Sequence, residues 1–187
     1  DKCSSPMGAR MLRTWLSMPV MDLNELDDRH SVVQYFVDNQ DDLTRLQTMV
    51  GDIGDLERII ARAAAGKIMP REVMQLRRGL SQTRPIMDLC KGRGVDALES
   101  MMNSVSDCGE LVDYLTHTMH PETAAAIGKG DVIASGVSAE LDDLRKLARH
   151  GKEYLLDIQQ REIERTGIAS LKIGFNNVFG YYLEVRN

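Results

Sequence analysis

Cysteine is scarce, aromatic residues make up only 5% of the chain, and no long apolar run occurs. The three cysteines, Cys3, Cys90 and Cys108, are an odd number without a CxxC pair, which favours reduced thiols over a disulfide or metal framework. No stretch approaches the roughly 18 apolar residues that span a membrane, and the first residues do not read as a secretory signal. These absences predict a cytoplasmic protein that does not enter a membrane.

Catalytic motifs are also missing. Residues 128–131 read GKGD and lack the first glycine and the Ser or Thr of a GxxxxGK[ST] phosphate loop. Ser135 lies in ASGVS, which is not a GxSxG nucleophile elbow. His117 and His120 are spaced i,i+3, but no third zinc ligand accompanies them. We therefore expect no catalytic residue, cofactor or metal in this chain. The alternative, a metal hydrolase at the two histidines, predicts stoichiometric zinc.

Neither sign of charge dominates the chain, but the charges are unevenly distributed. The net charge of −5 argues against a surface built throughout for nucleic acid. Between Arg58 and Arg93, nine basic residues stand against two acidic ones. This segment can form a phosphate-contacting face, or it can pair with the acidic remainder of the chain. The second interpretation is favoured.

Helical periodicity is abundant. Ser5 can cap a helix that starts at Pro6 and ends before Pro19. The predicted apolar face of this helix consists of Met7, Met11, Leu12, Trp15 and Leu16. Asp22 and Glu25 have the spacing of a capping box and open a second helix. Its inward face is predicted to contain Leu26, Val33, and Phe36 or Val37.

More helices are expected around residues 43–50, over residues 53–65 and from Pro70 onward. Residues 92–120 predict less regular helices, interrupted by glycine and ended by proline. The expected fold class is therefore mostly α, with a helical core domain over residues 1–137.

A long helix is predicted over residues 138–166, where a serine cap is followed by acidic residues that suit the helix dipole. An a/d seam runs along one side and consists of Leu141, Leu144, Ala148, Gly151, Leu155 and Ile158. Ion pairs at i,i+4 are expected between Asp142 and Lys146 and between Asp157 and Arg161. Beyond the seam the helix is polar on nearly all sides. We therefore expect a rod of about 43 Å that leaves its packed neighbour as an arm.

Residues 167–187 change to the period of a β-strand. Leu171, Ile173 and Phe175 alternate with polar residues or glycine, and YYLEV follows after the short turn NNVFG, which predicts a β-hairpin. A two-stranded hairpin alone is marginal in water. We therefore expect its partner strands to be missing and the chain to be truncated at Asn187.

Lys172, Asn176 and Asn177 are the candidate binding residues of this hairpin. Their cationic or amide side chains lie on or near the predicted tip and suit phosphate oxygens. The alternative is that the asparagines serve the backbone geometry of the turn. The sequence leaves both interpretations open.

Several strings resemble the MutS family of DNA mismatch-repair proteins. They are SPMGARMLRTWLSMPV, DLNELDDRHSVVQYF, GDIGDLERIIAR, PREVMQLRRGL, DVIASGVSAELDDLRKL and RTGIASLKIGFNNVFGYYLEV. The strings occur in the family's order across essentially the whole chain, which makes a chance match very improbable. The resemblance implies the central core and lever helices of a longer protein, called the parent below, with residues 167–187 as the beginning of a truncated clamp.

The resemblance also implies what the parent does. Family members have a mismatch-reading domain with a Phe-x-Glu wedge, which is absent at Phe36, Phe175 and Phe179, and an ATPase domain that builds the dimer. The parent is thus expected to bind mismatched double-stranded DNA, ATP and Mg, to form a homodimer and to act with a MutL-type partner. This chain is expected to be the non-enzymatic module that couples the ATPase to the clamp. The alternative is a helical protein–protein interaction module that uses its apolar faces.

Overall fold

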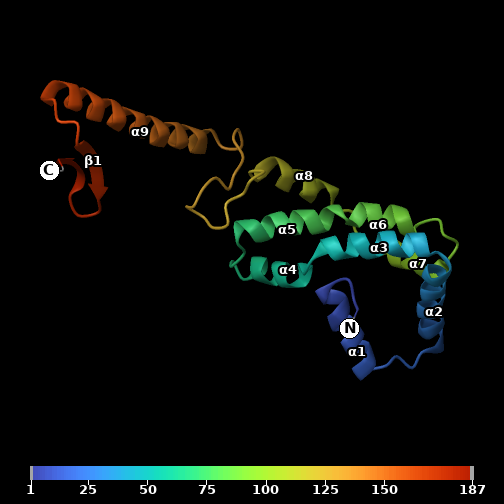
Figure 1. Cartoon of the computed structure of the whole chain (residues 1–187). Coiled ribbons are helices and arrows are strands. Elements are labelled where there is room, and N and C mark those ends of the chain that lie inside the picture. The colour runs from blue at the N-terminus through green and yellow to red at the C-terminus, as the bar shows by residue number, and fades with distance from the viewer. Residues whose placement is uncertain (1, 186–187) are drawn as a thin grey trace. The chain divides into compact units, whose positions relative to one another are not determined.

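The computed structural model describes residues 2–185, apart from the side chain of residue 149, and these divide into two compact units. Unit 1 covers residues 1–134 and unit 2 covers residues 135–187. Unit 1 is built of helices, and unit 2 combines one long helix with a two-stranded hairpin (Figure 1). The predicted fold class, mostly α with a short C-terminal hairpin, is confirmed.

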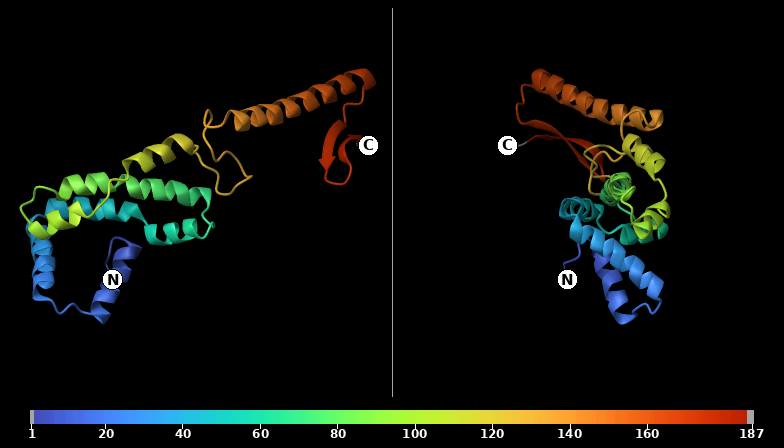
Figure 2. Two further views of the ribbon diagram at one scale, coloured as in Figure 1. Left: turned by 180° about the vertical axis from the view of Figure 1, so that it is seen from behind. Right: turned by 90° about the vertical axis from the view of Figure 1, so that its right-hand side faces the viewer.

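In unit 1, helix α5 (Pro70–Ser81) packs against several other helices. This helix contacts α3, α4, α6 and α8, while α2 contacts α3 and α7, and both views in Figure 2 show α3 alongside α5 and α6. The bounds are α1 Pro6–Ser17, α2 Leu23–Asp38, α3 Gln40–Ile53, α4 Leu56–Ala64, α5 Pro70–Ser81, α6 Thr83–Cys90, α7 Asp96–Asn103 and α8 Gly109–Thr118.

Local capping explains where the first two helices begin. The Ser5 hydroxyl oxygen accepts from the backbone N–H of Gly8 at 3.1 Å, and the Asp22 carboxylate accepts from the second residue of α2 at 2.8 Å. The caps at Ser5 and Asp22 are therefore confirmed, whereas the described bonds of Glu25 do not complete a capping box with Asp22. Glu25 pairs with Arg29 one turn later at 2.5 Å, on the exposed side of α2.

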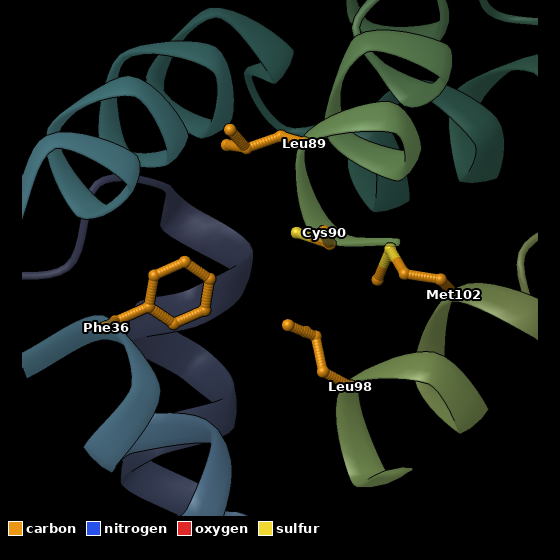
Figure 3. Packing of buried hydrophobic residues seen from close by; sticks show 5 residues of the cluster. All are labelled: Phe36, Leu89, Cys90, Leu98 and Met102. Atoms are coloured by element: carbon orange, nitrogen blue, oxygen red, sulfur yellow. The ribbon is translucent and has the colours of Figure 1, made fainter. Parts of the chain in front are cut away.

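The core of unit 1 lies where α2, α6 and α7 meet. Its buried side chains are Phe36, Leu89, Cys90, Leu98 and Met102, and Figure 3 shows them converging from these helices. Half-buried apolar side chains from α3 surround this cluster. Through Phe36 the core joins α2 to α6 and α7, whose buried residues follow Phe36 by more than 50 residues in the sequence.

The inward face of helix α2 differs from the predicted one at a single position. Phe36 is buried as expected, but Val32 packs against the core, whereas Val33 is 60% and Val37 55% exposed. Val32 and Phe36 are four residues apart and therefore lie on one stripe of the helix. The prediction is therefore confirmed for Phe36, the first of the two alternatives, and Leu26 is half-buried. It is wrong for Val33, because two adjacent valines allow two phases of the same periodicity.

The apolar face predicted for α1 is not buried in unit 1. Met11, Leu12, Trp15 and Leu16 are between 41% and 77% exposed. The Trp15 ring is instead covered on one side by the guanidinium of Arg29, whose Cζ lies 3.8 Å from the ring centroid. Periodicity identified the stripe correctly, but the described residues of unit 1 leave it largely uncovered.

Unit 2 begins with α9, Ala139–Thr166, and continues into β1, Leu171–Asn176, and β2, Gly180–Val185. The Ser138 hydroxyl oxygen accepts from the N–H of Leu141 at 3.2 Å and starts the helix. Gly167 ends it with a φ of 72°, a left-handed conformation that glycine adopts without strain. The strands are antiparallel. A long helix and a β-hairpin thus occur in the part of the chain where the sequence predicts them.

Candidate functional site

The hairpin packs on the C-terminal half of α9. Leu171 is 6% exposed, and the side-chain oxygen of Gln159 accepts from the backbone N–H of Ile173 at 3.1 Å. Leu155 and Leu156 line a small hollow of about 240 Å³ between helix and hairpin. Gln159 lies in the helix end that the sequence predicts to be polar on nearly all sides. In the structure it satisfies a backbone donor of β1 and so joins the hairpin to its helix.

Cross-strand packing holds the hairpin together. Gly174 lies opposite Tyr182, and the Tyr182 ring occupies the space beside the glycine. Phe175 lies opposite Tyr181, with ring centroids 4.9 Å apart. Aromatic pairs of this kind stabilise antiparallel strands beyond the area they bury.

The three candidate binding residues occupy two places on the hairpin. Lys172 is exposed near the start of β1, in register with Glu184. Asn176 and Asn177 lie at the other end of the strand, and four residues of extended chain separate Lys172 from Asn176 by about 13 Å. The structure therefore does not gather these residues into one pocket. They are spread along one strand and its turn.

Asn176 has a clear role in the turn. Its side-chain oxygen accepts from the backbone N–H of Val178 at 3.0 Å and of Phe179 at 2.7 Å. Such a bond pattern closes a turn through the asparagine side chain. The turn interpretation thus accounts for the Asn176 oxygen, while Asn177 remains exposed beside it.

Apolar side chains at the tip were not predicted as functional. Val178 is 82% exposed and Phe179 is 79% exposed. The string NNVFG predicts a turn, and this pattern alone does not distinguish its two apolar residues as functional. The exposed side chains of Val178 and Phe179 lie beside the amides of Asn176 and Asn177. Together they suit contact with a surface that has both polar and apolar groups.

The seam of α9 is only partly covered within unit 2. Leu155 and Ile158 are half-buried on the side that carries the hairpin, whereas Leu144 is 57% exposed and Gly151 is exposed. The seam was predicted to pack against a neighbour along its length. In the described part of unit 2, Leu141 at the start of the seam is half-buried as well, and the middle of the seam is exposed.

The ion pairs on α9 differ from those predicted. Asp142 pairs with Arg145 at 3.4 Å, and Lys146 pairs with Asp143 at 3.1 Å. The Asp142 carboxylate also accepts from the N–H of Gly136 at 2.7 Å, which draws it toward the helix start and away from Lys146. Among the described residues no ion pair forms at the second predicted i,i+4 site, between residues 157 and 161.

The basic segment of unit 1 is mostly unpaired. Arg62 pairs with Glu72 at 2.9 Å, and Arg93 pairs with Asp42 at 3.6 Å. Within residues 2–185, no ion pair involves the other basic residues of the segment, which are Arg58, Lys67, Arg71, Arg77, Arg78, Arg84 and Lys91. The favoured interpretation, pairing with the acidic remainder of the chain, is therefore wrong for most of them.

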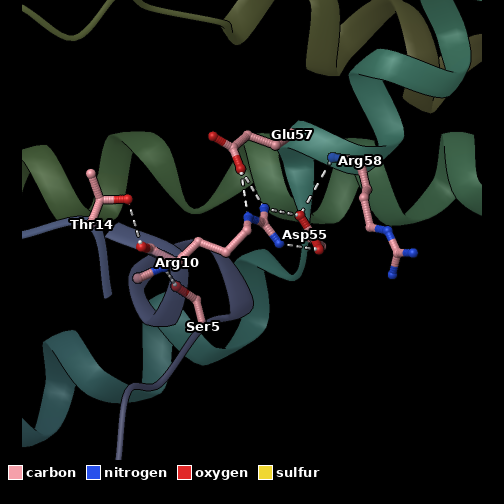
Figure 4. A network of polar contacts seen from close by, with 7 residues as sticks. Ser5, Arg10, Thr14, Asp55, Glu57 and Arg58 are labelled. Atoms are coloured by element: carbon pink, nitrogen blue, oxygen red, sulfur yellow. Dashed lines mark hydrogen bonds and ion pairs between the residues drawn. The ribbon is translucent and has the colours of Figure 1, made fainter. Parts of the chain in front are cut away.

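A paired arginine holds α1 against the start of α4. Arg10 forms ion pairs with Asp55, at 2.7 Å, and with Glu57 (Figure 4). Asp55 also caps α4, because its carboxylate accepts from the N–H of Arg58 at 3.4 Å. The hydrogen bond from Arg10 lowers the pKa of the Asp55 carboxyl and raises the pKa of the guanidinium. Both charges thus stabilise the native contact between the two helices.

A second polar contact lies at the edge of the core. The Tyr35 hydroxyl donates to Asp42 at 2.6 Å, which raises the pKa of the phenol. Arg93 shares the same carboxylate. Burial raises the pKa of the nearby Cys90 thiol, so the thiol is kept protonated and unreactive.

The histidines of the HxxH string form separate local bonds. A ring nitrogen of His117 contacts the carbonyl oxygen of Asp113 at 2.7 Å, and that of His120 accepts from the N–H of Glu122 at 3.1 Å. The described residues contain no group of three or more His, Cys, Asp or Glu side chains placed to hold a metal ion. No helix within them is long and apolar enough to cross a membrane.

Comparison with protein families decides the classification of this chain. The family model described as MutS domain III matches residues 1–172. The chain belongs to this family. The match spans all of unit 1, α9 and the start of β1, so the MutS resemblance of the sequence strings is confirmed over most of the chain.

Several relatives of the chain are named DNA mismatch repair protein MutS. DNA mismatch repair protein MutS of Parabacteroides distasonis and that of Flavobacterium psychrophilum are each 46% identical to the chain over all 187 residues. The protein of the same name from Porphyromonas gingivalis is 44% identical over the same length. The chain spans 21–22% of the length of these relatives. Membership of the MutS domain III family supports a role in DNA mismatch repair.

Proposed function

We propose that the chain is a non-catalytic part of a DNA mismatch-repair parent and that α9 acts in it as a lever. The observation that carries the proposal is a helix of 28 residues whose C-terminal half supports a β-hairpin through Gln159 and Leu171. Such an element moves its hairpin as one body when its other end is displaced. The exposed N-terminal part of the seam, around Leu144, offers a face for a further helix of the parent.

The hairpin is proposed as the beginning of a clamp on the DNA backbone. Lys172 supplies a cation, and Asn177 supplies an exposed amide at the tip. The side-chain oxygen of Asn176 is used by the turn, so its contribution to phosphate is restricted to the amide nitrogen. Contacts of this kind position a protein on duplex DNA without reading its sequence.

Nucleotide chemistry is assigned to other parts of the parent. Residues 128–131 do not fit ATP, because they lack the glycine spacing and the hydroxyl of a phosphate loop. ATP with Mg, the homodimer contact, the MutL-type partner and a cytoplasmic location are therefore proposed for the parent as a whole, by family membership.

A proline in the middle of α9 tests the lever. The change Gly151→Pro in the parent breaks the helix, since proline removes a backbone hydrogen bond and clashes with the preceding turn. We expect ATP to lose its ability to accelerate release of mismatched DNA, while ATP hydrolysis persists. The matched control is Gly151→Ala, because no atom lies within 4 Å of the added Cβ. Unchanged DNA release by the proline variant contradicts the lever role.

The exposed stripe on α1 favours a second candidate, a protein–protein interaction module. Leu16 is 77% exposed and Met11 is 56% exposed, and an exposed apolar stripe of this kind marks a contact surface. This function predicts that Leu16→Asp weakens the association of the parent with a protein partner and leaves ATP-driven DNA release intact. Equal association of both forms argues against it.

A further inference from the structure

An open hollow of about 410 Å³ lies in unit 1 between the end of α3 and α5. Three arginines of α5, Arg71, Arg77 and Arg78, line it together with Asp52 and Gln75. We propose that this hollow is a binding site for the phosphodiester backbone of duplex DNA. It lies in a different unit from the hairpin and does not depend on the lever role of α9.

The charge of the hollow lacks an internal partner. In the part of the chain that the structure describes, no carboxylate forms an ion pair with Arg71, Arg77 or Arg78. Some other arginines of unit 1, such as Arg10 and Arg62, are paired with carboxylates. Three guanidinium groups against the single carboxylate of Asp52 leave an excess of two positive charges in one concave surface. Like charges on neighbouring positions repel each other, and a bound polyanion removes this repulsion.

The spacing of the arginines matches a nucleic-acid strand. Arg71 and Arg78 are seven residues apart, which is two helical turns and brings both to the same side of α5. Their separation along the helix axis is about 10 Å, and three successive nucleotides of a strand advance by about the same distance. Arg77 is half-buried and extends the positive surface around the helix.

Helix α5 is held firmly at both ends. In its first turn, the Glu72 carboxylate accepts from the N–H of Met69 at 2.8 Å and pairs with Arg62. Near its C-terminus, Gly79 lies so close to Ile53 that a Cβ would be 2.6 Å from the carbonyl oxygen. A fixed helix presents its guanidinium groups with little loss of backbone entropy on binding.

The lining favours DNA over an acidic protein. Protein interfaces have a desolvated apolar or aromatic centre, whereas Met74 is the one large apolar side chain among the described residues that line this hollow. Guanidinium forks bind phosphate in bidentate geometry. A polar surface with three such forks and one thioether therefore fits a sugar–phosphate backbone better than a folded partner.

Fluorescence anisotropy with fully paired duplex DNA tests the site, using the whole 187-residue chain. The test variant is Arg71→Gln, Arg77→Gln, Arg78→Gln, and the control removes three cations elsewhere: Arg13→Gln, Lys129→Gln, Arg161→Gln. The test variant is expected to bind about tenfold more weakly or worse, and its log K against log salt slope is expected to fall by about three. The control is expected to change both quantities far less, and circular dichroism checks that each variant keeps its helices.

Three results overturn the proposal. The first is an equal loss of DNA affinity in the test and control variants, and the second is no DNA binding by the unchanged chain at about 50 mM salt. The third is a test variant that loses affinity for polyglutamate but not for DNA in a parallel titration, which would indicate an acidic protein partner. A third variant with lysine at the three positions keeps the charge and is expected to retain most of the affinity. Loss of lever function after Gly151→Pro leaves this site intact, so the two proposals fail separately.

Discussion

The ring of Tyr182 occupies the space that a side chain at Gly174 would need. A Cβ added to Gly174 would lie 2.7 Å from Cζ of the tyrosine on the facing strand. The two residues are in register across the hairpin, so the glycine lets the aromatic ring lie flat over β1. Their contact explains why the strand pattern carries a glycine at a position where strands rarely benefit from one.

The first prediction concerns this contact. Gly174→Val displaces the Tyr182 ring, and overpacking of this kind costs about 1–3 kcal/mol. Hydrogen exchange of the backbone N–H groups of β1 and β2 is therefore expected to become faster. The matched control, Lys172→Val, adds the same side chain at an exposed position of the same strand. Slower or unchanged exchange in the Gly174 variant would show that the ring has another place to lie.

The second prediction concerns the crossing of α5 over the end of α3. The change Gly79→Ala places a Cβ 2.6 Å from the carbonyl oxygen of Ile53 and 2.8 Å from a methyl of Leu56. We expect the free energy of unfolding of unit 1 to fall by about 1–3 kcal/mol, because the contact is with backbone that cannot easily shift. Urea unfolding followed by circular dichroism measures this.

The control for this crossing is Gly51→Ala. Its Cβ meets nothing closer than 3.8 Å, and the residue lies inside α3. Alanine is a better helix former than glycine by about 0.5–1 kcal/mol, so this variant is expected to be more stable. If both alanine variants shift stability in the same direction, the close approach at Gly79 is not the cause.

The third prediction uses the lowered pKa of Asp55. A carboxyl whose folded pKa lies below its unfolded value stabilises the protein above the unfolded pKa of about 3.9, and this stability is lost as the pH falls through the folded pKa. The chain is therefore expected to lose thermal stability between about pH 5 and the acid limit, partly through Asp55. Arg10→Gln removes the main cause of the shift and is expected to flatten this part of the profile.

Asp55→Asn separates the charge from the cap. Asparagine still caps a helix, so this variant loses the ion pair with Arg10 and keeps the start of α4. We expect Asp55→Asn and Arg10→Gln to reduce stability at neutral pH, and the double variant to cost less than the sum of both. Strict additivity in melting curves would show that the two side chains do not act as a pair.

Local sequence signals predicted local structure well. The caps at Ser5, Asp22 and Ser138, the length of α9 and the hairpin were all visible, because each depends on residues within one or two turns of each other. The exposed face of α1, the inward position of Val32 and the unpaired arginines of α5 were not predictable. Each depends on which distant segment lies nearby, and periodicity carries no information about that.

The candidate binding residues show the same limit. Lys172, Asn176 and Asn177 were selected by chemical type, and the sequence placed them correctly on a hairpin. It did not show that the Asn176 oxygen closes the turn or that Phe179 is exposed at the tip. Hydrogen-bond partners of a side chain depend on the turn geometry, which the residue types alone leave open.

The last prediction separates the turn role of Asn176 from a role at phosphate. Asn176→Asp keeps an oxygen that accepts from the N–H groups of Val178 and Phe179, so the hairpin is expected to remain ordered. The new negative charge repels DNA, and the affinity of the parent for duplex DNA is expected to fall by about tenfold at low salt, less at high salt.

Asn176→Ala removes the acceptor and is expected to disorder the turn as well, whereas Asn177→Ala leaves the turn unchanged and weakens DNA binding alone. Titration of paired DNA, with hydrogen exchange as the readout of the turn, distinguishes these outcomes: if Asn176→Asp and Asn177→Ala both bind DNA like the unchanged parent, the hairpin tip makes no backbone contact and its asparagines serve the turn.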